Sequence, residues 1–183
     1  MHLLAAEPGR IDDGDEAIDL RQSPAEMVVV TAADTELACL SAAKARLGAD
    51  APELRLVNLQ RLKHPMSVDL WVDRTLARAR LVIVRLLGGA AYWSYGLERL
   101  TALARSRAVA LVVIPGDDRP DSSLDGLSTV SARERALIWS YFNGYGIDNA
   151  AGLLIHAQHL LGRRDVPGPA PVMETPLRFS RTP

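Results

Sequence analysis

Residues Leu81–Leu87 have the sequence LVIVRLL and are followed by Gly88-Gly89, and this stretch decides the fold. Six of its seven side chains are apolar, a pattern typical of a strand that is buried on both faces of a sheet. Met27–Thr31 (MVVVT) and Val109–Ile114 (VALVVI) show the same pattern. Leu54–Leu59 (LRLVNL) alternates more, which predicts a strand nearer the edge of the sheet.

The segments between these runs have apolar residues at three- and four-residue spacing, which predicts amphipathic helices. One begins at a cap at Asp34 or Thr35, and the others cover Ser67–Ala79, Gly96–Ser106, residues 132–142 after a capping box of Ser131 and Glu134, and a last stretch from Ala150 to Leu161. Alternating strands and helices predict an α/β fold. We expect an open, mostly parallel sheet of four to five strands, flavodoxin-like or Rossmann-like, with helices on both faces.

The composition fits one domain, because 183 residues with 48% hydrophobic and 23% charged side chains can bury a single core. The apolar runs are far shorter than the roughly 20 residues that cross a bilayer, and the N-terminus does not resemble a secretory signal, so we expect no membrane contact and a cytoplasmic location. The balance of 21 basic and 22 acidic residues predicts no nucleic-acid partner. Cys39, alone in an apolar helical pattern, is interpreted as a buried thiol.

Three parts can be distinguished along the chain. Residues 1–26 carry seven acidic and two basic side chains, a net charge of −5, and are interpreted as an acidic strand and loop. Residues 27–162 contain all the predicted strands and helices and form the α/β head domain. Residues 163–183 hold five of the eleven prolines and too few apolar side chains to order themselves, which predicts a disordered tail.

Ligands of open parallel sheets bind beyond the carboxyl ends of the strands, and the turn after Leu81–Leu87 supplies candidates there. Gly88 and Gly89 let backbone amides approach a ligand, and Tyr92 and Trp93 offer rings that stack on a flat one. Alternatively, the glycines only turn the chain and the rings only cover the end of the sheet. The chain has no GxGxxG and no Walker A sequence, so a phosphate site is weakly supported.

Charged candidates lie at the same predicted edge. Arg85 is inside an apolar strand and needs a carboxylate partner, for which Asp117 and Asp118 are the nearest choices, as a structural ion pair or as part of a ligand site. The two aspartates are also open to a divalent cation. His64 is held extended by Pro65 and aims at this edge, so it is the titratable residue to test first.

His156 and His159 are three residues apart and share a helix face, as paired metal ligands do. No third ligand lies near them in the sequence, so satisfied or solvated histidines are the favoured interpretation and the metal site stays unassigned. No spacing resembles a nucleophile elbow, and we predict no catalytic residue.

Several uncommon strings occur together in one order, from the N-terminus to about residue 162. They are residues 1–9 (MHLLAAEPG), 11–14 (IDDG), 23–24 (SP), 32–37 (AADTEL), 62–70 (LKHPMSVDL), 85–89 (RLLGG), 92–96 (YWSYG) and 115–118 (PGDD). As a set they resemble the amino-terminal region of the CobN-type large subunit of aerobic cobaltochelatase, a relative of the large subunit of magnesium chelatase.

The resemblance implies a role in cobalamin biosynthesis, where the large subunit binds hydrogenobyrinic acid a,c-diamide and inserts cobalt(II) while two AAA+-type partner subunits hydrolyse ATP. Such subunits are several times longer than this chain, and metal insertion is thought to occur in the body that follows this region. Residues 175–183 do not continue the family pattern. We therefore expect a head domain, or a truncated large subunit, that supplies binding or assembly surface and binds no cofactor itself. The alternative is an independent flavodoxin-like module that binds a small anionic ligand or a protein partner.

Overall fold

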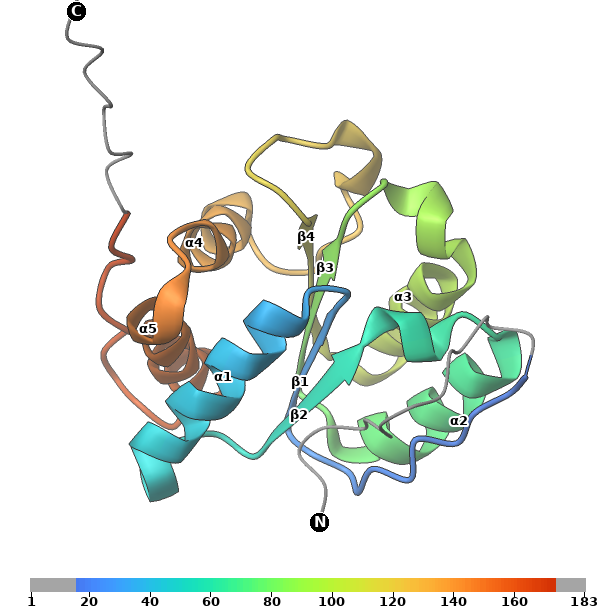
Figure 1. Cartoon of the computed structure of the whole chain (residues 1–183), viewed down its shortest axis with the longest axis horizontal. Helices are drawn as coiled ribbons and strands as arrows, with labels where there is room; N and C mark the ends of the chain where they lie inside the picture. The colour runs from blue at the N-terminus through green and yellow to red at the C-terminus, as the bar shows by residue number, and fades with distance from the viewer. Residues whose placement is uncertain (1–15, 174–183) are drawn as a thin grey trace, which may run out of the picture.

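The structure is a computed structural model that describes residues 16–173. Its centre is a sheet of four parallel strands, in the order β2-β1-β3-β4 (Figure 1). The strands are β1 (Met27–Thr31), β2 (Leu54–Asn58), β3 (Leu81–Leu86) and β4 (Ala110–Pro115). This arrangement confirms the predicted α/β class and the edge position of the alternating strand β2.

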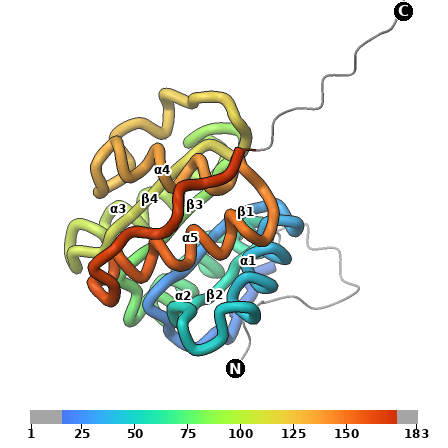
Figure 2. The backbone as a smooth tube through the Cα atoms, turned by 90° about the vertical axis from the view of Figure 1, so that its left-hand side faces the viewer, coloured from blue at the N-terminus to red at the C-terminus, as the bar shows by residue number. Residues whose placement is uncertain are grey.

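Helices cover both faces of the sheet (Figures 1 and 2). On one face lie α1 (Asp34–Leu47), α4 (Ala132–Asn143) and α5 (Gly146–Leu160), and on the other lie α2 (Pro65–Arg74) and α3 (Ser94–Arg107). The described residues also form the short 3-10 turns η1 (Gly48–Asp50), η2 (Leu59–Leu62), η3 (Thr75–Arg78), η4 (Ala90–Trp93) and η5 (Ser122–Leu124). Within residues 16–173, no helix combines the length and the hydropathy that crossing a bilayer requires.

Several helix ends differ from the sequence prediction, most clearly those of α2 and the start of α1. The helix predicted over Ser67–Ala79 begins two residues earlier and ends at Arg74, where the chain tightens into η3. Neither Asp34 nor Thr35 caps α1, because the N-cap is Ala33 and the Asp34 carboxylate accepts a hydrogen bond from Asn58 Nδ2 at 2.7 Å. The amide of Ala33 itself donates to Thr31 Oγ1 at 3.2 Å.

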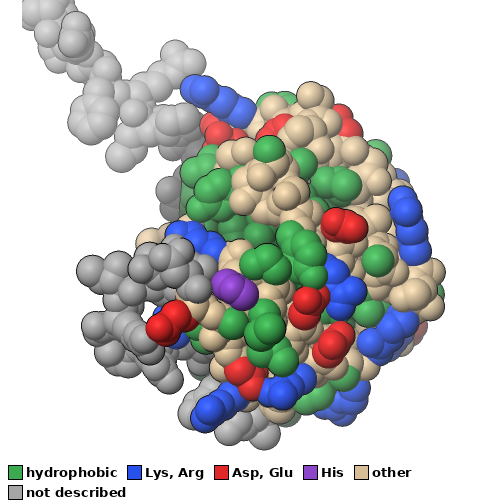
Figure 3. Space-filling view, turned by 90° about the vertical axis from the view of Figure 1, so that its right-hand side faces the viewer, with side chains coloured by type: hydrophobic (Ala, Val, Ile, Leu, Met, Phe, Trp, Pro, Cys, Tyr) green, Lys and Arg blue, Asp and Glu red, His purple; other side chains and the backbone are tan. Residues whose placement is uncertain are grey.

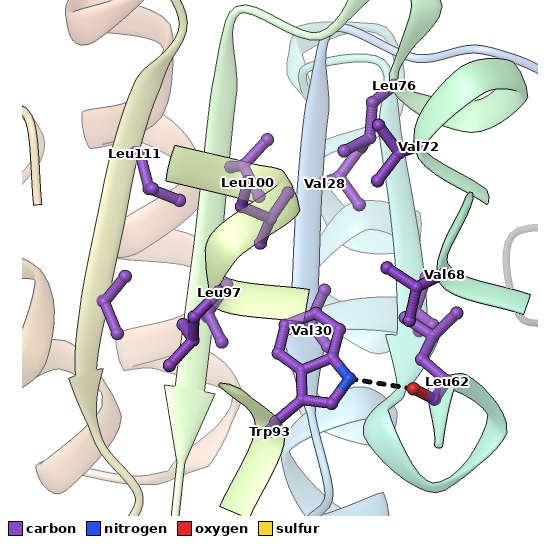
Figure 4. Close-up of a cluster of buried hydrophobic side chains, with 14 of the residues drawn as sticks. Val28, Val30, Leu62, Val68, Val72, Leu76, Trp93, Leu97, Leu100 and Leu111 are labelled. Atoms are coloured by element: carbon purple, nitrogen blue, oxygen red, sulfur yellow. Dashed lines mark hydrogen bonds between the residues drawn. The ribbon is translucent and has the colours of Figure 1, made fainter. Parts of the chain in front are cut away.

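The core on the α2 and α3 face is organised around two tryptophans (Figure 4). Trp71 and Trp93 are buried, with ring centroids 6.3 Å apart, and Trp93 Nε1 donates to the Leu62 carbonyl at 2.8 Å. Gly96 makes this packing possible, since a Cβ atom there would lie 2.1 Å from Cε2 of the Trp93 ring. The indole therefore joins η2 to the start of α3.

The outer edge of β4 is occupied by side chains from residues 128 and 129. The hydroxyl of Thr129 accepts from the Leu111 amide at 2.8 Å, and the hydroxyl of Ser128 accepts from the Val113 amide at 2.9 Å. The Thr129 amide donates to the Leu111 carbonyl at 2.8 Å. These groups satisfy main-chain atoms that a fifth strand would pair with in a longer sheet.

Residues 163–173 lie along α5 and return toward the start of that helix (Figure 2). We call this segment the strap. Tyr141 Oη donates to the Pro169 carbonyl at 2.5 Å, and Asn149 exchanges two hydrogen bonds with the Val172 main chain, at 2.7 and 2.8 Å. Side chains of α4 and α5 thus bond to the main chain of residues 163–173, the first half of the tail for which the sequence predicts disorder. Residues 174–183 of that tail lie outside the described residues.

The amino-terminal part is described from residue 16 onward, so most of the predicted acidic strand and loop lies outside the described residues. Residues 16–26 contain no strand and pack against the β2 edge. Gln22 Nε2 donates to the Leu56 carbonyl at 3.0 Å, and the Arg55 guanidinium donates to the Ser23 carbonyl at 2.9 Å. This segment therefore covers the edge of the sheet opposite β4.

Candidate functional site

The carboxyl edge of the sheet brings together loops that follow all four strands. The chain passes from β1 to α1 on one face and from β3 to α3 on the other, so the loops after these neighbouring strands diverge, as they do at ligand sites of open sheets. An open hollow of about 460 Å³ lies between the loops after β3 and β4, lined by residues 86–89, 115, 117 and 119–123. The structure thus places Gly88, Gly89 and Asp117 around one hollow.

The wall of this hollow is fixed by internal hydrogen bonds. Gly89 has a φ of +76°, and a Cβ atom there would approach Ser123 Oγ to 3.0 Å. The Ala90 amide donates to that same hydroxyl at 3.1 Å, and the Asp121 carboxylate accepts from both the amide and the hydroxyl of Ser123. The glycine pair therefore lets two loops approach each other, and whether it also meets a ligand stays a prediction.

Arg85 is paired with Glu36, a residue of α1 that the sequence analysis did not single out. Its Nε lies 2.8 Å from Glu36 Oε1, and the two side chains are 1% and 10% exposed. Arg85 also donates to the Gly116 carbonyl at 3.0 Å and to the side chain of Asn143. The expected ion pair with Asp117 or Asp118 is therefore wrong, because the guanidinium turns toward the α1 face, where it meets the largely buried carboxylate of Glu36.

Burial sets the proton affinities of this pair. Burial raises the pKa of the Glu36 carboxyl above its usual range, against the opposing effects of the Thr31 hydroxyl and the Arg85 charge. Burial also lowers the pKa of Arg85, and the negative charge of Glu36 works in the other direction. The Thr31 hydroxyl donates to Glu36 Oε2 at 2.6 Å, and the Phe142 ring lies 5.1 Å from the guanidinium carbon of Arg85. The cluster ties β1, β3, α1 and α4 together.

The other aromatic and histidine candidates divide into buried and exposed groups. Trp93 is core, whereas Tyr92 is 51% exposed and its hydroxyl accepts from Gln60 Nε2 at 2.9 Å. His64 is the N-cap of α2, and its Nδ1 accepts from the Met66 amide at 3.1 Å. Of these three residues, Tyr92 presents most of its side chain to solvent.

The aspartates after β4 take part in local turns. Asp117 Oδ1 accepts from the Arg119 amide at 3.1 Å, and the Asp117 carbonyl accepts from Trp139 Nε1 at 2.9 Å. Asp118 is exposed. Among residues 16–173, no group of three or more His, Cys, Asp or Glu side chains is placed to hold a metal ion.

The two histidines of α5 contact the strap. His156 is 2% exposed, its Nδ1 accepts from the Gly168 amide at 3.3 Å, and its Nε2 meets the Glu134 carboxylate. His159 Nδ1 donates to the Arg164 carbonyl at 2.9 Å. Both are thus satisfied histidines, as favoured. Ser131 caps α4 as predicted, but the Glu134 carboxylate is bonded to His156.

The fold and this edge define an open, parallel α/β domain with the β2-β1-β3-β4 order of flavodoxin-like sheets. No family model matches the chain. It is 47% identical over 170 residues to the aerobic cobaltochelatase subunit CobN of a Sinorhizobium species, and 42% identical over 150 residues to the CobN subunit of Pseudomonas aeruginosa. These matches cover 93% and 82% of this chain, but only 13% and 12% of the two CobN subunits.

The chain is therefore homologous to a segment of the CobN cobaltochelatase subunit, and it spans about an eighth of the length of these relatives. A solved structure agrees in fold. The catalytic subunit of cobaltochelatase from Mycobacterium tuberculosis superposes with a TM-score of 0.66 at 22% identity, over 82% of this chain and 12% of that chain. The resemblance predicted from the sequence strings is confirmed.

Proposed function

We propose that this chain acts as the head domain of a CobN-type large subunit in the ATP-dependent insertion of cobalt(II) into hydrogenobyrinic acid a,c-diamide. In this proposal the chain supplies binding or assembly surface, and the insertion centre belongs to the much longer remainder of such a subunit. The sequence identity to two CobN subunits supports the proposal, and the small share of those subunits that is matched supports its restriction to one part.

A contact role is supported by a difference between the polar and the apolar side chains at the carboxyl edge of the sheet. Two titratable groups of this edge are engaged inside the domain, since the Glu36 carboxylate is paired with the buried Arg85 and His64 Nδ1 caps α2. Apolar side chains are exposed beside them, with Leu87 at 61%, Met66 at 57% and Tyr92 at 51%. Exposed apolar side chains surrounded by charged residues are typical of surfaces that bind another molecule.

Figure 3 shows a band of hydrophobic side chains across the α2 and α3 face, with acidic and basic side chains around it. Tyr92 and Tyr95 are one helical turn apart, and the Tyr95 hydroxyl donates to the Asp69 carboxylate on α2 at 2.8 Å. This hydrogen bond joins α3 to α2 beside the exposed ring of Tyr92. The proposed contacts are the tetrapyrrole, the AAA+-type subunits or the body of the large subunit.

A hybrid subunit tests this proposal. The matched segment of the P. aeruginosa CobN subunit is replaced by this chain, and cobalt insertion is measured with the AAA+-type subunits, ATP and hydrogenobyrinic acid a,c-diamide. We expect the hybrid to be active and the subunit without the segment to be inactive. The chain alone, with the same subunits, should insert no cobalt. A hybrid no more active than the deleted subunit would overturn the proposal.

A matched pair of substitutions refines the test. Tyr92→Ala in the hybrid removes an exposed ring at the carboxyl edge, and Ile147→Ala removes an apolar side chain, 43% exposed, from the start of α5 on the opposite face. We expect the first to lower the insertion rate and the second to leave it unchanged. Equal rates would show that this surface is not used.

The independent binding module for a small anionic ligand is less well supported. Asp117 and Asp121 line the hollow at the carboxyl edge together with one guanidinium, that of Arg119. Two carboxylates against one cation do not attract an anion. Binding of inorganic phosphate or a nucleotide to the isolated chain, measured by calorimetry, would favour this alternative.

A further inference from the structure

The middle of the strap packs directly against the backbone of α5 (Figure 2). A Cβ atom on Gly168 would lie 2.5 Å from the Gly152 carbonyl oxygen and 2.7 Å from the His156 main-chain nitrogen, so this position requires a glycine. The approach is main chain to main chain, and the strap has no flexible side chain here with which to adjust. Its docking at this point is therefore sensitive to the hydrogen bond that Gly168 makes.

The hydrogen-bond partner of Gly168 is the buried imidazole of His156. Its Nδ1 accepts from the Gly168 amide at 3.3 Å, and its Nε2 faces the Glu134 carboxylate. A main-chain amide only donates, so Nδ1 must present a lone pair, and the proton of the neutral ring must be on Nε2, which donates to Glu134. The neutral imidazole with its proton on Nε2 is thus the form that makes both bonds.

The titratable groups that face this imidazole come from α4 and α5. Besides Glu134, they are Tyr141, with a ring centroid 5.9 Å away, and His159, at 6.0 Å. Burial, with a smaller contribution from Glu134, raises the pKa of Tyr141, so its hydroxyl stays a neutral donor to the strap in acid. His159 Nδ1 donates to a strap carbonyl, and a protonated imidazole donates there as well.

The strap itself brings charged side chains that point away from this contact. All three are exposed: Arg163, Arg164 and Asp165. Among the groups named here, His156 is therefore the one whose hydrogen bond to the strap is lost when it takes up a proton.

From this geometry we propose that His156 is a pH-sensitive latch for the middle of the strap. The proton and the Gly168 amide compete for one lone pair, that of Nδ1. When the imidazole is protonated, Nδ1 becomes a donor that faces another donor, and the strap moves away from α5 at Gly168. Glu134 then holds the imidazolium through Nε2. The inference does not depend on the proposed role in cobalt insertion.

The two ends of the strap stay in place in acid, because their main-chain hydrogen bonds involve no imidazole. The Arg163 amide donates to the Gln158 carbonyl at 2.8 Å, and the Val172 main chain exchanges two hydrogen bonds with Asn149. Protonation of His156 thus opens the strap between its ends and does not release it.

Nuclear magnetic resonance of the full 183-residue chain, labelled with nitrogen-15, tests the latch. At about pH 7.5 the ring nitrogens of His156 should show the neutral tautomer with its proton on Nε2. Between about pH 7.5 and about pH 5.5, the protection of the Gly168 amide against hydrogen exchange should fall several-fold, with about tenfold as the limit for one imidazole that titrates near about pH 6.5 in water. The Val172 amide is the internal control and should keep its protection.

Three results of this experiment would overturn the inference. They are a neutral ring with its proton on Nδ1, protection of Gly168 that does not change with pH, and an equal loss of protection at Val172.

Three variants of the full chain assign the titration. His156→Asn keeps an acceptor near the position of Nδ1 but does not titrate, so the protection of Gly168 should no longer depend on pH. His159→Asn is the matched control and should respond to pH like the wild type. Glu134→Gln keeps an acceptor for Nε2 without the charge that favours an imidazolium, so the change at Gly168 should move to lower pH. A pH response that survives His156→Asn, that is lost in His159→Asn or that moves to higher pH in Glu134→Gln would contradict the latch.

Discussion

Arg85 and Glu36, which belong to different βα units, form an ion pair with 2.8 Å between Nε and Oε1 beneath the carboxyl edge of the sheet. The same guanidinium bonds to the Gly116 carbonyl and the Asn143 side chain. A charge inside an apolar strand is therefore compensated by groups from three other elements. These contacts link β3 to α1, to α4 and to the residue that follows β4.

Removing one member of this pair should destabilise the domain strongly. Arg85→Met leaves the Glu36 carboxylate buried without its cation, and we expect a loss of about 3–5 kcal/mol in the free energy of unfolding. Arg85→Met with Glu36→Leu should lose much less than the sum of the single losses. Urea denaturation of the four proteins gives this coupling. Additive losses would mean that the two charges do not interact.

The raised pKa of Glu36 predicts a specific pH dependence. A folded-state pKa above the unfolded value of 4.5 means that the folded chain binds the proton more tightly. The stability contributed by this group is fully present below pH 4.5 and declines as pH rises through the folded pKa. The unfolding free energy of the wild type minus that of Glu36→Gln should therefore fall above pH 4.5. A difference that rises with pH would contradict the direction of the shift.

The hydroxyls that occupy the β4 edge should protect the domain from self-association. Thr129→Val and Ser128→Ala leave the amides of Leu111 and Val113 without these acceptors, at about 1–3 kcal/mol for each amide that stays buried and unsatisfied. An open edge is also a template for strand pairing between molecules. Sedimentation velocity should show dimers or larger species for the double variant. Ser94→Ala, which removes an exposed hydroxyl on α3, is the control and should sediment like the wild type.

The strap should contribute measurably to stability. A chain ending at Gly162 loses the partners of Tyr141, Asn149 and His156, and unsatisfied buried polar groups cost about 1–3 kcal/mol each. We expect its thermal midpoint to fall by several degrees, and that of a chain ending at Met173 to stay the same. Equal midpoints for both truncations would show that the strap only rests on the surface.

The strands were predictable because continuous apolar runs report burial on both faces directly. Met27–Thr31 has the predicted bounds of β1, and Leu81–Leu86 differs from the prediction by one residue. Helix ends were less predictable, since side-chain competition decides them, as where Asp34 bonds to Asn58 and leaves Ala33 as the cap.

The partner of Arg85 was missed for a different reason. Proximity at the carboxyl edge pointed to Asp117 and Asp118, whereas the direction of the side chain, toward the α1 face, selected Glu36. The sequence did contain a signal for Glu36 as the partner. Glu36 lies in the first turn of α1, next to Leu37, and Leu37 and Leu40 form the buried side of that helix. The contacts of the strap were not predicted, because the amino-acid composition of a segment indicates only its apolar content. It does not indicate that Tyr141 and Asn149 donate hydrogen bonds to main-chain carbonyls of the strap.

The path of the strap along α5 couples the position of the strap's end to the position of the helix. Arg163 is bonded to Glu26 near the end of the helix, and Val172 is bonded to Asn149 near its beginning. The end of the strap is therefore held by Asn149 of α5, and a shift of α5 along its axis by one turn, about 5.4 Å, would carry Val172 with it. Displacement of α5 would thus shift the point at which the chain leaves the domain, at Met173.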